Sequence, residues 1–444
     1  MLQEFKTHIN TNFPFLKDKK IVIAISGGLD SVVLYHLLHQ LQFNIFLAHC
    51  NFKLREQESD LDEEFVVKLS QKSSNQIFRI EFDTDNYAKK HKCSTQIAAR
   101  ELRYNWFQEL LSKYNFDYIA TAHHADDNLE TFLINLTRGT GLEGLTGIPE
   151  TNGNIIRPLL PFSREEILLY AKKNNIEWRE DASNAATKYT RNKIRHLVIP
   201  VLKEINPSLL ASFSNSLNYL EESKQIIEDR IEEVSKLIIT PFSCAQGNAC
   251  LKINIHKIQQ LSNPKAYLYQ FLKAYHFTEW DDVYHLLSAQ SGKQVFSKTH
   301  RLLKDRDVLI LSKKSNGIFS GVEKLFFIEQ NQTEITHPIR LTFKKVAEKS
   351  KANKQTIYVD KDLLKYPLIV RKRKNGDYLY PAGMQGKKKL SKYFKDEKLS
   401  LLEKENTWLL CNADYKIIWV INYRQDRRFL PQKTTENYLK ITQL

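Results

Sequence analysis

The stretch IVIAISGGLDSVVLYHLL, residues 21–38, joins two apolar runs through a turn rich in serine and glycine. This order predicts a buried strand, a tight turn and a helix. Such a turn directs backbone N–H groups toward one point, where the helix dipole adds positive potential, so it favours phosphate binding. Ordinary strand-to-helix turns have a similar composition. The residues predicted to bind phosphate are Ser26, Gly27, Gly28, Leu29, Asp30 and Ser31.

Asp30 is unusual for a phosphate loop, because a carboxylate repels phosphate unless a divalent cation lies between them. No lysine follows the glycines, so the loop is not a Walker A motif. We therefore expect a nucleotide site that also uses Mg²⁺.

Strand and helix patterns alternate over residues 1–206, which we expect to form the first domain. This alternation predicts an α/β fold with a parallel sheet and helices on both faces. We expect strands at 20–25, 45–49, 76–82 and 117–122, and helices at 30–42, 59–72, 95–114, 126–137 and 163–174. Ligands bind beyond the carboxyl ends of such strands. The 26–31 loop, His49-Cys50-Asn51 and His123-His124 should therefore meet in one crevice.

A second polar cluster, HHADDNLET at residues 123–131, follows a predicted strand and opens a helix. One aspartate here is most simply a helix cap, but two His, two Asp and one Glu exceed what a cap needs. Carboxylates at this edge can hold Mg²⁺ or orient an attacking group. We take Asp30, Asp127 and His123 as candidate catalytic residues, and Asp30 and Asp127 as candidate metal ligands.

The sequence GTGLEG at residues 139–144 matches the dinucleotide-binding pattern G-x-G-x-x-G. It follows a predicted helix instead of a strand, so that interpretation fails.

The second half of the chain predicts smaller domains. Residues 207–312 indicate a mostly helical middle domain that starts with a long helix over 207–237. Residues 313–355 indicate a linker with some strands. Short apolar runs over 356–444 predict a basic α+β C-terminal domain.

The chain carries 66 Lys and Arg against 51 Asp and Glu, a net charge of +15. Because ATP needs only a few cations, this excess favours a larger polyanion such as RNA. Ten Lys and Arg between 371 and 398 are interleaved with Tyr378, Tyr380, Tyr393 and Phe394, which suits backbone neutralisation and base stacking. A solvated lysine face is the alternative. Candidate RNA-binding residues are Arg100, Arg103, Arg191, Arg195, Arg371, Arg373, Lys387, Lys388 and Lys389.

No apolar run is long enough to span a membrane, and the first residues lack a signal-peptide pattern. We expect a cytoplasmic protein.

The 26–31 loop resembles the PP-loop, SGGxDS, of the N-type ATP pyrophosphatases. Five further motifs accompany SGGLDS along the chain. They are AHCNFKLRE at 48–56, AARELRYNWF at 98–107, TAHHADDNLETFLINLTRGTGLEGL at 121–145, YTRNKIRHLVIP at 189–200 and VRKRKNGDYLYPAGMQGKKKLSKYFKDEKLS at 370–400. Together these six motifs resemble those of the tRNA(Ile)-lysidine synthases. Cys50 and Phe52-Lys53 depart from the commoner family residues.

The resemblance implies a two-step reaction. ATP adenylates C2 of the wobble cytidine in the CAU anticodon of tRNA(Ile) and releases pyrophosphate, after which the lysine ε-amine displaces AMP to form lysidine. The implied cofactors are ATP and Mg²⁺, and the implied partners are tRNA(Ile) and L-lysine, with a homodimer left open.

Two alternatives compete with this function. A PP-loop tRNA thiolation enzyme needs reactive or cluster-binding cysteines, whereas the five cysteines form no C-x-x-C motif. A non-catalytic basic RNA-binding protein leaves the acidic 123–131 cluster unexplained.

Overall fold

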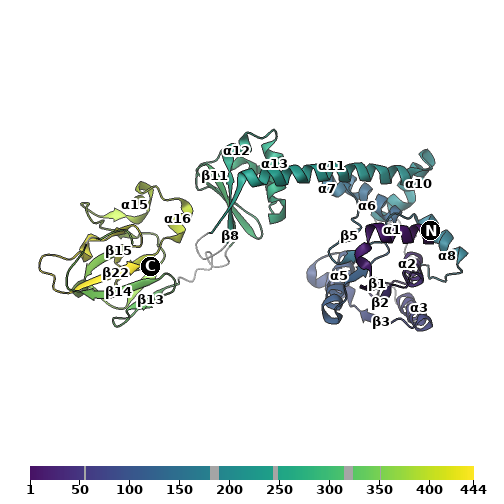
Figure 1. Cartoon of the computed structure of the whole chain (residues 1–444), viewed down its shortest axis with the longest axis horizontal. Helices are drawn as coiled ribbons and strands as arrows, with labels where there is room; N and C mark the ends of the chain where they lie inside the picture. Colours follow the sequence, from purple (N-terminus) through teal and green to yellow (C-terminus); the bar gives the residue numbers. More distant parts are fainter. Residues whose placement is uncertain (55–56, 181–189, 244–248, 315–323, 351) are drawn as a thin grey trace. The chain divides into compact units, whose positions relative to one another are not determined.

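A computed structural model describes residues 1–444 except 55–56, 181–189, 244–248, 315–323 and 351 (Figure 1). The chain forms two compact units, Met1–Glu228 and Asp229–Leu444. The boundary between them along the sequence falls within the long helix α11 (Leu209–Ile238). No helix in the described part combines the length and apolar character needed to cross a membrane.

A six-stranded sheet of order β3-β2-β1-β4-β6-β5 forms the centre of the first unit. All neighbouring strands are parallel except the β5–β6 pair. This confirms the predicted parallel sheet. The strands are β1 (Lys20–Ala24), β2 (Asn44–Asn51), β3 (Ile77–Glu81), β4 (Tyr118–Ala120), β5 (Thr151–Asn152) and β6 (Ile155–Ile156).

Helices cover both faces of this sheet. Alternate residues of β1 point to opposite faces, so Ile21 and Ile23 join one apolar cluster and Val22 joins another. The first cluster includes Leu34, and the second includes Phe107. The helices are α1 (Leu2–Asn12), α2 (Leu29–Gln40), α3 (Gln57–Ser73), α4 (Thr84–His91), α5 (Thr95–Tyr114), α6 (Ala125–Thr137), α7 (Leu142–Leu145) and α8 (Arg164–Lys173).

A short helical segment connects this domain to α11. It consists of α9 (Thr190–Lys193), a π-helical turn η3 (Ile194–Val198) and α10 (Ile199–Ile205). The start of α11 packs on α6, where the rings of Phe132 and Phe213 lie 5.2 Å apart.

The middle region contains a five-stranded antiparallel sheet, of order β7-β8-β11-β10-β9, beside its helices. The sequence predicted a mostly helical domain over residues 207–312, and that prediction did not include this sheet. The strands are β7 (Ile239–Ser243), β8 (Ala249–Asn254), β9 (Gln294–Phe296), β10 (His300–Asp305) and β11 (Val308–Lys313). The helices are α12 (Ile255–Gln259), α13 (Pro264–Leu272) and α14 (Trp280–His285).

The C-terminal region contains two larger antiparallel sheets, of orders β12-β16-β19-β20-β21 and β13-β14-β22-β15, and the small pair β17-β18. Residues 326–346, within the predicted linker, supply three of these strands. The first, β12, pairs with β16, whereas β14 pairs with both β13 and β22. The strands are β12 (Phe326–Ile328), β13 (Glu334–Ile335), β14 (Leu341–Val346), β15 (Thr356–Asp360), β16 (Leu368–Arg371), β17 (Tyr378–Leu379), β18 (Lys388–Lys389), β19 (Leu409–Cys411), β20 (Ile417–Val420), β21 (Arg424–Gln425) and β22 (Tyr438–Gln443). The helices are α15 (Leu390–Asp396) and α16 (Leu401–Asn406).

Candidate active site

The serine- and glycine-rich loop lies between the end of β1 and the start of α2, as predicted. Gly28 is the N-cap of α2. Gly27 has a φ of +91°, a backbone conformation that glycine adopts without the strain a side chain would add. The Ser31 hydroxyl donates to the Gly28 carbonyl at 2.9 Å and lies 3.1 Å from the Ser26 hydroxyl. These bonds fix the loop before any ligand binds.

Arg179 also holds the loop, although no sequence motif marks this residue. Its backbone N–H donates to the Gly27 carbonyl at 3.0 Å. Its guanidinium is paired with Asp62 at 2.5 Å and with Glu58 at 2.7 Å, both on α3. The chain after α8 is thereby tied to the phosphate loop and to α3.

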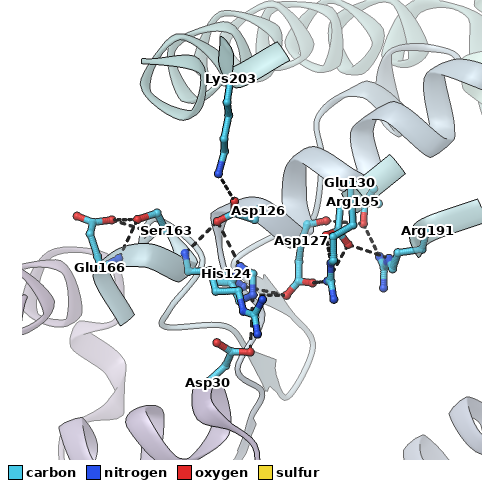
Figure 2. Close-up of polar contacts among 12 residues, drawn as sticks. Asp30, His124, Asp126, Asp127, Glu130, Ser163, Glu166, Arg191, Arg195 and Lys203 are labelled. Atoms are coloured by element: carbon cyan, nitrogen blue, oxygen red, sulfur yellow. Dashed lines mark hydrogen bonds and ion pairs between the residues drawn. The ribbon is translucent and has the colours of Figure 1, made fainter. Parts of the chain in front are cut away.

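His124 brings the loop and the acidic cluster together (Figure 2). Its side chain is buried. Its Nε2 atom lies 3.7 Å from the Asp30 carboxylate and 3.5 Å from that of Asp127, while its Nδ1 atom lies 3.7 Å from Asp126. Asp30 and Asp127, from two distant segments, therefore face the same imidazole nitrogen.

The two neighbouring aspartates have different surroundings. Asp126 accepts the Arg164 backbone N–H at 2.9 Å and pairs with Lys203 at 2.8 Å, so it holds α8 and α10 against α6. Asp127 accepts the His124 backbone N–H at 3.3 Å, which is a capping bond, but it also lines a cavity. Asp127 therefore caps the helix, as expected for one aspartate of the cluster, and also lies in the site.

Glu130 is a buried carboxylate that pairs with both predicted RNA-binding arginines of this region. Arg195 contacts it at 2.5 and 3.0 Å and reaches Asp127 at 3.3 Å. Arg191 contacts Glu130 at 3.3 Å and donates to Thr131 at 2.8 Å. Burial raises the pKa of Glu130, and the charge-assisted bonds from Arg195 oppose that rise. In this structure both arginines are thus bound to the acidic helix.

A cavity of about 260 Å³ lies at the carboxyl edge of the sheet. Its walls include the 26–31 loop, Cys50, His123 and Asp127, so the three predicted segments meet there as expected. Arg103 and Arg191 also line it. The cavity thus has a phosphate loop on one wall, carboxylates on another and cations at its edge.

The electrostatics of the cavity follow from its burial. Burial lowers the pKa of His123 to about 4, so the imidazole is neutral near pH 7, and its Nδ1 atom lies 3.0 Å from the Thr121 hydroxyl. Burial raises the pKa of Asp30, and the nearby His124 opposes that rise. The Oδ1 atom of Asp30 is buried without a hydrogen-bond partner among the described residues.

The donor set fits a magnesium ion shared with a nucleotide. Among the described residues, no group of three or more His, Cys, Asp or Glu is arranged to hold a metal. Mg²⁺ in nucleotide sites is commonly bound by one or two carboxylates together with substrate phosphates. Asp30, with its unpartnered oxygen, and Asp127 beside it supply such a pair.

Three family models match the chain in order. They are a PP-loop domain at residues 1–202, a TilS substrate binding domain at 246–314 and a TilS substrate C-terminal domain at 368–441. The tRNA(Ile)-lysidine synthase of Parabacteroides distasonis is 38% identical over 99% of this chain and 99% of its own length. The chain belongs to the tRNA(Ile)-lysidine synthase family.

Other members of the tRNA(Ile)-lysidine synthase family are similarly related. The Bacteroides thetaiotaomicron protein is 38% identical over 97% of both chains. The Bacillus subtilis protein is 29% identical over 94% of this chain and 93% of its own length. Within the family motifs quoted above, residues 55–56 and Tyr189 lie outside the described residues.

Arg100 and Arg103, both predicted to bind RNA, lie on α5 close to the cavity of this lysidine synthase family member. Both are exposed. The Arg100 guanidinium lies 4.7 Å from the centre of the Tyr104 ring, and that of Arg103 lies 5.2 Å from the Phe52 ring. No carboxylate partner is recorded for either among the described residues, so both can reach an anion.

Several residues of the basic cluster at 371–398 are buried or form ion pairs within the C-terminal region, instead of facing solvent as the sequence predicts. Arg371 is buried and forms two 2.8 Å bonds to Asp377, and Lys388 pairs with Asp396 at 2.7 Å. Tyr393 and Phe394 are buried core residues, so they offer no surface for stacking. For Arg371, Tyr393 and Phe394, the expectation of an RNA-facing side chain is corrected, because each is buried. The ion pair of Lys388 lies at the surface, so its role in RNA binding stays a prediction.

Other cations of this region remain exposed. Arg373, Lys387 and Lys389 face solvent, and Lys387 lies 3.6 Å from the centre of the Tyr378 ring. Arg427 lies 5.3 Å from the Tyr380 ring. Arg427 is not part of the 371–398 cluster, because it lies 29 residues beyond it in the sequence. Only the fold brings Arg427 to these tyrosines, so sequence spacing could not identify it.

Proposed function

We propose that the protein joins the ε-amine of L-lysine to C2 of the wobble cytidine of tRNA(Ile) with a CAU anticodon. The product lysidine pairs with A instead of G, so the tRNA reads AUA instead of AUG. ATP is split into AMP and pyrophosphate. The observation that carries this proposal is the single cavity that joins the phosphate loop to Asp127 and His123, in a chain related to lysidine synthases over nearly its full length.

In the first step the cytidine O2 attacks the α-phosphorus of ATP, and the bond to pyrophosphate breaks. The N–H groups at the start of α2 would bind the phosphates. Asp30 and Asp127 would hold Mg²⁺, which neutralises charge on the departing pyrophosphate when bound. His124 keeps these two carboxylates turned toward one point.

In the second step the ε-amine of lysine attacks C2, the C2–O bond to the adenylate breaks, and AMP leaves with that oxygen. The attacking form is the neutral amine, which the ε-ammonium group becomes by releasing one proton to water. Asp127, which lines the cavity, would bind and orient the amine. His123 would accept a hydrogen bond from it, because burial keeps the imidazole neutral.

Six of the cations that are exposed in the structure would bind the RNA. They are Arg100 and Arg103 beside the cavity, and Arg373, Lys387, Lys389 and Arg427 in the C-terminal region. Arg191 and Arg195 would contact RNA only by exchanging some of their contacts with Glu130 for phosphate.

A pyrophosphate-release assay tests the function. Wild-type protein should release pyrophosphate over many turnovers only when L-lysine, ATP and tRNA(Ile) with CAU are all present, because without lysine the reaction stops at the adenylated tRNA after one equivalent. A methionine tRNA should not replace the isoleucine tRNA. A thiolation enzyme would show no dependence on lysine, and a passive RNA-binding protein would release no pyrophosphate. Either result would refute the proposal.

The Asp30→Ala and Asp127→Ala variants test the site. Each should abolish incorporation of labelled lysine while preserving tRNA binding, because each removes a carboxylate of the cavity without removing an RNA contact. Asp85→Ala, at an exposed position on α4, is the matched control and should keep wild-type activity. Normal incorporation by either cavity variant would exclude the role given to that residue.

A further inference from the structure

The middle region contains an open cavity of about 350 Å³ lined by residues of α13 and α14. Tyr269, Trp280 and Tyr284 line it, together with Leu268 and Gln270. Its volume falls within the range of about 300–1,000 Å³ typical of ligand sites. Nothing in the proposed catalytic steps uses it.

The aromatic walls of this cavity remain accessible. Tyr269 is 41% exposed and Tyr284 is 38% exposed, although a tyrosine gains from burying its ring. The Tyr269 and Trp280 rings meet at 61°, with their centres 4.7 Å apart. Trp280 packs against the apolar core of the middle region. Tyr269 and Tyr284 keep part of their ring surface exposed, where a planar ligand can stack.

The polar groups of the cavity suit the edge of a nucleobase. The Gln270 amide offers a donor and an acceptor, and no partner for it is recorded among the described residues. Lys265 and Asp281, at the mouth, form a 2.6 Å ion pair that cancels their charges. The cavity therefore presents ring faces and one amide, with little net charge of its own.

The surrounding domain is complementary to a polyanion. Residues 246–314 contain eleven Lys and Arg and five Asp and Glu, a net charge of +6. The family model that matches these residues is described as a TilS substrate binding domain. A cationic domain with an open aromatic cavity has the two elements that single-stranded nucleic acid needs, charge for the backbone and ring faces for the bases.

We propose that the cavity of Tyr269, Trp280 and Tyr284 binds one unstacked base of the tRNA substrate. The base stacks on the tyrosine rings, and the Gln270 amide contacts its edge. This inference rests on the proposed function, since it takes tRNA as the substrate. It adds a base-binding site outside the catalytic cavity.

Binding of two RNAs to the full-length protein tests the site. The probes are a transcript of tRNA(Ile) with a CAU anticodon and a blunt RNA duplex in which every base is paired. Tyr269→Ala should weaken tRNA binding roughly 5- to 100-fold, the loss expected for one stacked base, and should leave duplex binding unchanged. Tyr284→Ala should act in the same direction, and Tyr269→Phe should bind like wild type because it keeps the ring.

The controls separate stacking from damage to the fold. Tyr219→Ala removes a tyrosine that is 67% exposed on α11, outside the cavity, and should bind both RNAs like wild type. Circular dichroism should show unchanged unfolding temperatures for all variants. If Tyr269→Ala is unstable, Tyr284→Ala carries the test.

Two results would overturn the inference. One is unchanged tRNA binding by folded Tyr269→Ala and Tyr284→Ala. The other is an equal loss for the tRNA and the duplex, which would mean that the tyrosines act on backbone contacts. Failure of the proposed function is separate, since it would appear in wild-type protein as absent lysine-dependent pyrophosphate release.

Discussion

Lys372 places an ammonium group inside the C-terminal region. Its Nζ atom lies 3.9 Å from the centre of the Trp408 ring and donates to the Asn406 carbonyl at 2.6 Å. Burial lowers the pKa of Lys372 to about 8, and Glu405 opposes that shift. Holding the charge there costs stability wherever the lysine is protonated in both the folded and unfolded states.

This cost predicts that the free energies of unfolding of wild type and Lys372→Met differ by an amount that depends on pH. Below about pH 8 both states carry the charge, so the cost is fully present. Between pH 8 and about 10.5 only the unfolded state binds the proton, so wild-type stability rises with pH relative to the variant. The free energies of unfolding of the two proteins in urea should therefore converge across this window. A difference that stays constant with pH would contradict the burial of this charge.

The phosphate loop is the element whose geometry depends most on one residue. Gly27 has a φ of +91°, and a Cβ added there would lie 3.4 Å from the Phe65 ring. Gly27→Ala should therefore strain the loop by about 1–2 kcal/mol. We expect weaker ATP binding in calorimetry, with tRNA binding retained.

Gly153→Ala is the matched control for this element. Gly153 also has a positive φ, +58°, but it lies in the turn between β5 and β6 and has no atom within 4 Å of an added Cβ. Its alanine variant should lose similar stability and keep its affinity for ATP. If both variants lose ATP affinity equally, strain alone accounts for the effect and the loop has no special role.

Elements with strong local signals were predictable. The helix predicted over 95–114 has these bounds in the structure as α5, and the helix predicted over 163–174 is α8, where Ser163 and Glu166 form a capping box. The middle sheet was not predicted, because β9 has only three residues and β10, HRLLKD, carries polar or charged residues at four of its six positions. The link from Arg195 to Glu130 spans 65 residues, so spacing along the chain could not reveal it.

At the scale of the whole molecule, the excess of positive charge has to be divided between structural and RNA-binding cations. Arg371 and Lys388 are engaged by carboxylates within the C-terminal region. Lys387 and Arg427 are exposed and flank tyrosine rings. The net charge of +15 therefore overstates the number of groups available to phosphates, and the fold selects which ones they are.

Salt dependence of tRNA binding counts the available groups, because each phosphate contact releases counterions. Lys387→Ala and Arg427→Ala should each weaken tRNA binding and lower the slope of log K against log salt by about 1. Lys6→Ala, at an exposed position on α1, should leave the slope unchanged. Arg371→Ala should instead lower the unfolding temperature, since it leaves Asp377 without its bidentate partner. Unchanged slopes for both Lys387→Ala and Arg427→Ala would place the phosphate contacts on other cations of the chain.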